Sequence, residues 1–137
     1  MNLHLLKLCV GCDSVEDLLR WRRAPQEKGR PWILRTRQTP RRADELIDGG
    51  SLYRVFRGAI LSRQRIEAVA TVGEGLERRC EIILDEAIVL TVPTVRRPFQ
   101  GWRYLEAGEA PADLAEAEFG EAPPPELARR LREIGAW

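Results

Sequence analysis

The stretch L-Y-R-V-F-R-G-A-I-L-S-R-Q-R-I-E-A-V-A-T-V, residues 52–72, decides the fold that this chain is expected to take. Its two runs at 52–57 and 59–72 are rich in β-branched and aromatic residues and meet at Gly58, a pattern typical of two strands joined by a tight turn. Because the second run is longer than an ordinary strand, we expect a bend or a bulge within it.

Shorter apolar runs on both sides of this pair predict further strands. Each run has the length of one strand and is bounded by glycine, proline or polar residues. The runs lie at residues 3–10, 32–38, 79–84 and 88–92. Pro93 is expected to end the last of them, because proline cannot donate a hydrogen bond to a neighbouring strand.

Two helices are expected among these strands. Ser14 is a suitable N-cap for a helix that follows the first strand. Thr39 and Pro40 predict the start of a second helix over residues 41–48, and Gly49 is expected to end it in a left-handed conformation. The order of elements predicts an α+β domain with a curled, mostly antiparallel sheet and two to four peripheral helices.

The length and the local composition indicate one domain and a short appendage. A chain of 137 residues fits a single hydrophobic core. Residues 1–105 form the expected α+β domain. From residue 106 the composition shifts to Ala, Glu and Pro, so residues 106–137 are expected to be an acidic appendage with a terminal helix, packed on the domain or partly disordered.

The sequence favours a cytoplasmic protein. No stretch approaches the ~20 apolar residues of a membrane span, and the N-terminal residues lack the layout of a signal peptide. Three cysteines, an odd number, are not typical of a secreted disulfide scaffold. We therefore expect no membrane partner, and the sequence does not indicate an oligomeric state.

The basic residues are concentrated in one part of the chain. The net charge is +1, but residues 20–65 carry 13 Lys and Arg against four Asp and Glu, whereas residues 104–137 carry three against eight. Such a cluster attracts phosphates. Twenty of the 22 basic residues are Arg, whose planar fork suits phosphate and base-edge contacts, and aromatic residues lie among them. This combination is typical of proteins that bind single-stranded nucleic acid.

Cys9 and Cys12 form a C-x-x-C motif between the first expected strand and the first expected helix. Thioredoxin-like proteins place a reactive dithiol in this way. The T-V-P segment at 91–93 resembles that of glutaredoxins, but the β-rich middle of the chain does not match that fold. Zinc requires two more ligands, for which His4 and Cys80 are candidates. Structural, redox and metal-binding roles all remain open for the motif.

No constellation for catalysis is evident. His4 is the single histidine and lies on an apolar strand, where a structural role is more common than catalysis. The acidic pairs at 44–45 and 85–86 are typical of solvated charge, and the chain contains no phosphate-binding loop of the G-x-x-x-x-G-K-[ST] type. We therefore predict no cofactor and favour a non-catalytic protein.

Three runs of sequence resemble a family of uncharacterised alphaproteobacterial proteins. They are K-L-C-V-G-C-D-S-V-E-D-L at 7–18, D-G-G-S-L-Y-R-V-F-R-G at 48–58 followed by R-Q-R-I at 63–66, and R-R-P-F-Q-G-W-R-Y-L at 96–105. The resemblance covers residues 1 to about 110 and implies no activity, since the family is a domain of unknown function.

The order of elements is also similar to that of PUA-like barrels, with the EVE and ASCH domains as the nearest examples. This resemblance implies a small curled barrel with a basic cleft that holds a nucleotide or a base. The cleft candidates that it implies are Arg35, Arg37, Arg41, Arg54, Arg63, Arg65, Trp102 and Arg103.

The sequence leaves three functional hypotheses. The first is a binding module for RNA or a nucleotide with an Arg-rich cleft. The second is a dithiol redox or metal-binding protein that uses Cys9 and Cys12. The third is a scaffold whose acidic appendage docks a basic partner or covers the protein's own Arg surface.

Overall fold

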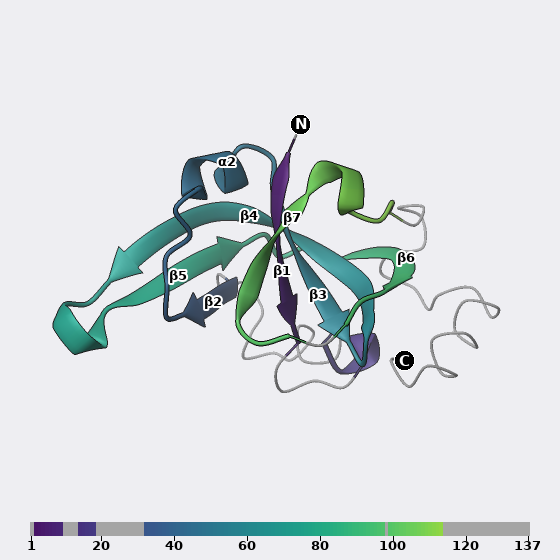
Figure 1. Cartoon of the computed structure of the whole chain (residues 1–137), viewed down its shortest axis with the longest axis horizontal. Coiled ribbons are helices and arrows are strands. Elements are labelled where there is room, and N and C mark those ends of the chain that lie inside the picture. The colour runs from purple at the N-terminus through teal and green to yellow at the C-terminus, as the bar shows by residue number, and fades with distance from the viewer. Residues whose placement is uncertain (1, 10–13, 19–31, 98, 114–137) are drawn as a thin grey trace.

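The computed structural model describes residues 2–9, 14–18, 32–97 and 99–113 (Figure 1). Seven strands form one mixed sheet in this part of the chain, and the sheet does not close into a barrel. The strands are β1 (Leu3–Leu8), β2 (Trp32–Thr36), β3 (Ser51–Phe56), β4 (Ala59–Val72), β5 (Arg79–Leu84), β6 (Val89–Val95) and β7 (Trp102–Glu106). Their order is β2-β5-β4-β3-β1-β7, with β6 paired to β4.

The helical elements within the described residues are short. They are α2 (Ala43–Ile47), the 3-10 turns η1 (Gly75–Glu77) and η2 (Ala107–Glu109), and a helical stretch at residues 15–18. The Oγ of Ser14 accepts a hydrogen bond from the backbone N–H of Asp17 at 3.2 Å, as the N-cap prediction requires. The rest of that predicted helix lies outside the described residues.

Strand β4 organises the sheet, because it is long enough to pair with three other strands. Its first half pairs with β3 and β6, and its second half pairs with β5. The register of these pairings shifts near Ile60 and again near Ile66, so the predicted irregularity within this strand is confirmed. Figure 1 shows β4 and β5 running together as an arm to η1.

The N-terminal strand β1 lies between β3 and β7. It is parallel to β3 and antiparallel to β7, and every other pairing in the sheet is antiparallel. The prediction of a mostly antiparallel sheet is therefore confirmed.

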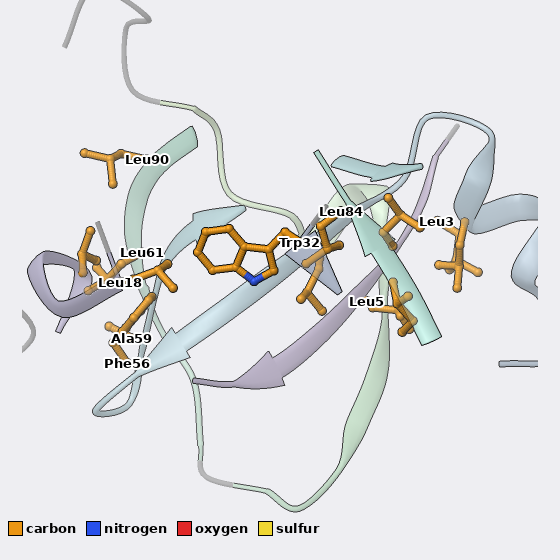
Figure 2. Packing of buried hydrophobic residues seen from close by; sticks show 14 of the residues in the cluster. Leu3, Leu5, Leu18, Trp32, Phe56, Ala59, Leu61, Leu84 and Leu90 are labelled. Carbon is orange, nitrogen blue, oxygen red and sulfur yellow. The ribbon is translucent and has the colours of Figure 1, made fainter. Parts of the chain in front are cut away.

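The main core lies on one face of this curled sheet. It collects apolar side chains from β1 through β6, and Trp32 lies within it, close to Leu84 (Figure 2). Each large apolar side chain buried in this way contributes about 1.5–3 kcal/mol relative to an exposed one. A smaller cluster on the other face contains Leu6, Tyr53 and Leu105, with Phe99 packed against it.

The end of α2 approaches β1 very closely at Gly50. A Cβ at this position would lie 2.3 Å from the carbonyl oxygen of Leu3 and 2.4 Å from that of Leu46, so no side chain fits there. The preceding Gly49 has a φ of 86°, which confirms the predicted left-handed end of this helix.

Two local predictions are wrong. Helix α2 begins after Arg42 and has no side-chain cap, because the hydroxyl of Thr39 instead bonds that of Thr71 at 2.6 Å. Strand β6 continues through Pro93. The pairing of β6 with β4 shifts at this point, between Leu90 and Thr94, so the missing N–H of the proline disrupts no regular ladder bond.

No helix among the described residues is long and apolar enough to cross a membrane.

Candidate nucleic-acid interface

A groove lies between β2 and β7, the strands at the two ends of the strand order. It consists of two hollows of about 540 and 500 Å³. Because both are lined by Arg37, Gln38 and Trp102, they are parts of one groove, here called the seam groove. The first hollow is also lined by Thr39, Arg41, Arg78 and Tyr104. The second is also lined by Lys7, Arg35, Thr36, Gln100 and Gly101.

In the part of the chain that the structure describes, the lining of the seam groove is basic and contains no carboxylate side chain. The guanidinium of Arg35 lies 3.1 Å from the carboxylate of Glu81 on β5, next to the groove. Within the described ranges, no carboxylate lies within ion-pair distance of Arg37, Arg41 or Arg78. These three charges are therefore available to an anionic ligand.

Two aromatic rings form one wall of the groove. Trp102 and Tyr104 lie on the same side of β7 because they are two residues apart on a strand. Their ring centroids are 5.1 Å apart and the rings are inclined at 73°, an edge-to-face arrangement. The hydroxyl of Tyr104 accepts a hydrogen bond from the backbone N–H of Arg42 at 3.1 Å. This contact ties the wall to the beginning of α2.

The charge of Arg42 is neutralised beside this wall. Its guanidinium donates two hydrogen bonds to the Glu45 carboxylate and lies 3.6 Å from that of Glu106. These bonds raise the pKa of Arg42 and lower that of Glu45. The guanidinium also lies 5.5 Å from the ring centroid of Tyr104. Arg42 therefore orients the tyrosine ring and is not free to bind an anion.

The structure brings four of the eight cleft candidates together. Arg35, Arg37, Arg41 and Trp102 all line the seam groove. The strand alternation predicted for 32–38 explains the position of Arg35, which is exposed while Trp32 faces the core.

Arg54 lies in the protein interior. Its side chain is on the core side of β3 and the residue is only 7% exposed. Two of its N–H groups donate to the Oε1 of Gln64, at 3.0 and 3.3 Å, and its guanidinium lies 5.7 Å from the ring centroid of Trp32. Burial lowers the pKa of Arg54 to about 10, so the side chain is still charged at neutral pH.

Arg63 lies on the opposite face of β4 from Gln64, as the alternation along this strand predicts. It forms two short hydrogen bonds with the carboxylate of Asp113, at 2.6 and 2.7 Å, and a third with the Oγ of Ser51 at 3.0 Å. Its charge is therefore neutralised within the protein.

Arg65 and Arg103 are exposed but do not line the seam groove. Arg103 alternates with Trp102 along β7 and lies 5.4 Å from the ring centroid of Phe99. On β7 the side chain of Arg103 therefore lies on the opposite side of the strand from the rings of Trp102 and Tyr104.

The groove residues that sequence reasoning missed include two cations and an aromatic ring, those of Lys7, Arg78 and Tyr104. Lys7 interrupts an otherwise apolar strand, and this break was the available signal. Its role depends on the register that pairs it with Trp102 across β1 and β7, which only the structure gives. Arg78 reaches the groove from the β4–β5 connection, and no local pattern indicates this.

A model of the family described as "Protein of unknown function (DUF1489)" matches residues 5–137. The chain belongs to this family. The match includes the acidic segment, so the family extends further along the chain than residue 110. No curated protein and no solved structure matches the chain.

The C-x-x-C motif of this DUF1489 chain is described only in part. Cys9 is half-buried and disulfide-bonded, and its backbone N–H donates to the carbonyl of Val55 at 2.9 Å. Cys12 lies outside the described residues, and Cys80 is a buried free thiol. Among the residues that the structure describes, no three His, Cys, Asp or Glu side chains are grouped as metal ligands.

His4 has a structural position in the fold. Its Nδ1 accepts a hydrogen bond from the backbone N–H of Ser51 at 3.0 Å, and its ring packs edge-to-face on Tyr53 with centroids 5.0 Å apart. Burial, and then the positive charge of Arg63, lower the pKa of His4. The imidazole is therefore neutral at pH 7 and joins β1 to β3.

Proposed function

We propose that this DUF1489 protein is a non-catalytic binding module for single-stranded nucleic acid, in the first place RNA, or for a nucleotide. The observation that supports this function best is a combination of side chains in one groove. Three arginines without a carboxylate partner among the described residues, Arg37, Arg41 and Arg78, lie there with the rings of Trp102 and Tyr104. Arginines hold the phosphate backbone, and ring faces stack on bases.

The dimensions of the groove favour a single strand over a duplex. Hollows of about 500 Å³ are of the size that holds one small ligand, such as one nucleotide each. Stacking of a base on an aromatic ring contributes about 1–3 kcal/mol, and it requires a base that is not stacked inside a duplex. Gln38 and Gln100 add hydrogen-bonding amides that could contact base edges.

The groove lining agrees with a binding role. Among the described residues it includes no carboxylate and no imidazole, the groups that most often form a general acid–base pair.

Fluorescence-polarisation titration of labelled RNA tests the proposal. Single-stranded and duplex RNA of about 12 nucleotides would be compared at about 50 and about 200 mM salt. We expect micromolar binding of the single strand that weakens with salt, and weaker binding of the duplex. Trp102→Leu should reduce single-strand affinity about tenfold, whereas Trp102→Phe, which keeps an aromatic face, should retain most of it.

The absence of single-strand binding at the lower salt concentration would refute this function. Equal losses in Trp102→Leu and Trp102→Phe would show that the ring does not act as a stacking platform.

A dithiol redox function is the second candidate, because Cys9 is disulfide-bonded and only half-buried. Thiol titration of the protein in glutathione buffers of graded potential tests it, with Cys9→Ser as the control. A disulfide that is reduced and re-formed reversibly, with a reduction potential in the range of cellular dithiol proteins, supports the function. A disulfide that stays oxidised throughout that range is structural.

A further inference from the structure

A row of chemically active side chains crosses four neighbouring strands. Lys7 on β1 is the register partner of Trp102 on β7 and of Arg54 on β3. Arg54 is in turn the register partner of Ser62 on β4. Directly paired residues extend their side chains to the same side of a sheet. The row therefore places an indole, an ammonium, a guanidinium and a hydroxyl next to one another on the core side.

The guanidinium in this row has no anionic partner in the part of the chain that the structure describes. Arg54 is more than nine-tenths buried, and its hydrogen bonds go to a neutral amide, that of Gln64. A buried cation without a counter-charge is unfavourable, since desolvation is not repaid by an ion pair. Such a residue is typical of a site that an anionic ligand completes.

Lys7 and Ser62, next to Arg54 in the row, lack an acceptor among the described residues. Lys7 lines the seam groove and has no carboxylate within ion-pair distance among the described residues. Burial and the nearby charge of Arg54 lower the pKa of Lys7, as expected for two cations close together. The Oγ of Ser62 is fully buried and has no hydrogen-bond partner within the described ranges. Two positive charges without a carboxylate partner and one hydroxyl without a hydrogen-bond partner among the described residues thus occupy paired positions on three neighbouring strands.

We propose that Lys7 and Arg54, assisted by Ser62, bind the terminal phosphate group of the nucleic acid or nucleotide whose adjacent base stacks on Trp102. This inference rests on the proposed function. A phosphomonoester carries close to two negative charges at neutral pH and matches the two cations. An internal phosphodiester carries one charge and continues in both directions. Because Arg54 is almost completely buried, only the end of a strand can reach it.

Three RNA strands of one sequence test the proposal by fluorescence polarisation. One carries a 5′-phosphate, one a 3′-phosphate and one hydroxyls at both ends, with the label at an internal position. We expect one of the two phosphorylated strands to bind about tenfold more tightly than the hydroxyl strand, which also identifies the end that is recognised. Adenosine 5′-monophosphate and adenosine 3′-monophosphate as competitors show whether a free nucleotide suffices.

The variants separate this site from the rest of the groove. Lys7→Gln and Arg54→Gln should abolish the preference for a phosphorylated end, so that each variant binds the phosphorylated and the hydroxyl strands with equal affinity. Arg35→Gln is the matched control, because Arg35 lines the same hollow as Lys7 but lies outside the row. It should keep the preference. A cooperative thermal unfolding transition shows that a variant is folded. If only one of Lys7→Gln and Arg54→Gln is folded, the strand preference of that variant tests the proposal.

The outcomes for the two proposals are distinguishable. Equal affinity of all three strands overturns the terminal-phosphate site and leaves the proposed function standing. If no strand binds, the proposed function fails, and the site is then judged by the unfolding temperature in inorganic phosphate. A rise in the wild type that is absent in Lys7→Gln supports a phosphate site, and no rise overturns it.

Discussion

The seam groove and the face around Arg63 contain similar residues but differ in how their charges are paired. On that face Arg63 pairs with Asp113, and Arg96 lies 3.6 Å from the carboxylate of Glu109. We call these four residues the acid-paired face. In the seam groove, within the described residues, only Arg35 has a carboxylate at this distance.

This difference explains why the local excess of basic residues is a poor guide to a binding site. Both regions draw arginines from the basic part of the sequence. The acidic partners of the acid-paired face come from residues 107–113, where the segment crosses β6 and the N–H of Val92 bonds the carbonyl of Ala112 at 2.8 Å. A ligand phosphate would have to displace Asp113 to reach Arg63, whereas it meets Arg37 and Arg41 directly.

The largest expected effect is the loss of RNA affinity when groove charges are removed. Arg37→Ala/Arg41→Ala should weaken single-strand binding roughly 30-fold, which is about 2 kcal/mol. It should also lower the slope of the logarithm of the affinity against the logarithm of the salt concentration by about two, because two phosphate contacts are lost. The charge-matched control, Arg65→Ala/Arg103→Ala, removes two exposed arginines outside the groove and should change the affinity only slightly. Polarisation titrations over a series of salt concentrations measure both. Equal losses in the two double variants would mean that the protein attracts RNA through its overall charge.

The second effect concerns the stability of the acid-paired face. Arg63→Gln leaves the carboxylate of Asp113 without its partner and should lower the free energy of unfolding by about 1–2 kcal/mol. Adding Asp113→Asn should recover part of this loss, because the unpaired charge is then removed as well. Urea unfolding of the wild type, both single variants and the double variant gives the coupling. Additive losses would indicate that the two side chains do not interact in solution.

Arg54 should behave in the opposite way to Arg63. Arg54→Gln removes a buried charge that has no acidic partner in the described structure, and the new amide can still donate to Gln64. The free energy of unfolding is therefore expected to stay within about 1 kcal/mol of the wild type or to rise. The same urea experiment measures it. A loss as large as that of Arg63→Gln would show that the guanidinium is important for the fold itself.

The smallest effect is a pH dependence centred on His4. The pKa of this residue is lower in the folded protein than in the unfolded chain, so the unfolded chain binds more protons when the pH falls below about 6.5. The free energy of unfolding therefore has its full value above this pH. It decreases as the pH falls through the pKa of His4 in the unfolded chain and then through its lower pKa in the folded protein. His4→Asn can keep the acceptor for the N–H of Ser51 without titrating.

Unfolding curves between pH 7.5 and 5 test this comparison. The wild type should lose a fraction of a kcal/mol more than His4→Asn over this range. Arg63→Gln should reduce the difference, since the charge of Arg63 also disfavours the protonated imidazole. Parallel pH profiles for the wild type and His4→Asn would contradict the prediction.

Most strands follow from local patterns, because alternation and length are properties of neighbouring residues. The runs at 52–57 and 59–72 correspond to β3 and β4 within one residue, and residues 79–84 correspond to β5. The start of α2 was misplaced because the hydroxyl of Thr39 bonds Thr71, which is 32 positions away, and no local pattern contains that contact.

The candidate site was less predictable because it depends on register. Parity along one strand predicted correctly that Arg63 and Gln64 lie on opposite faces. It could not show that Arg54 is buried against Gln64, or that Asp113 pairs with Arg63, because both facts depend on how distant segments align. The row formed by Trp102, Lys7 and Arg54 likewise exists only through two strand pairings.

The position of β1 has a consequence for the way the protein is made. This strand is synthesised before the other described strands, yet its neighbours are β3 and β7, and Leu3 is paired with Glu106. During translation β1 can therefore pair with β7 only after the other strands of the sheet have been synthesised. Contacts so distant in sequence slow folding. We expect the nascent chain to complete this sheet only after β7 has left the ribosome, with one edge of β1 exposed to chaperones until then.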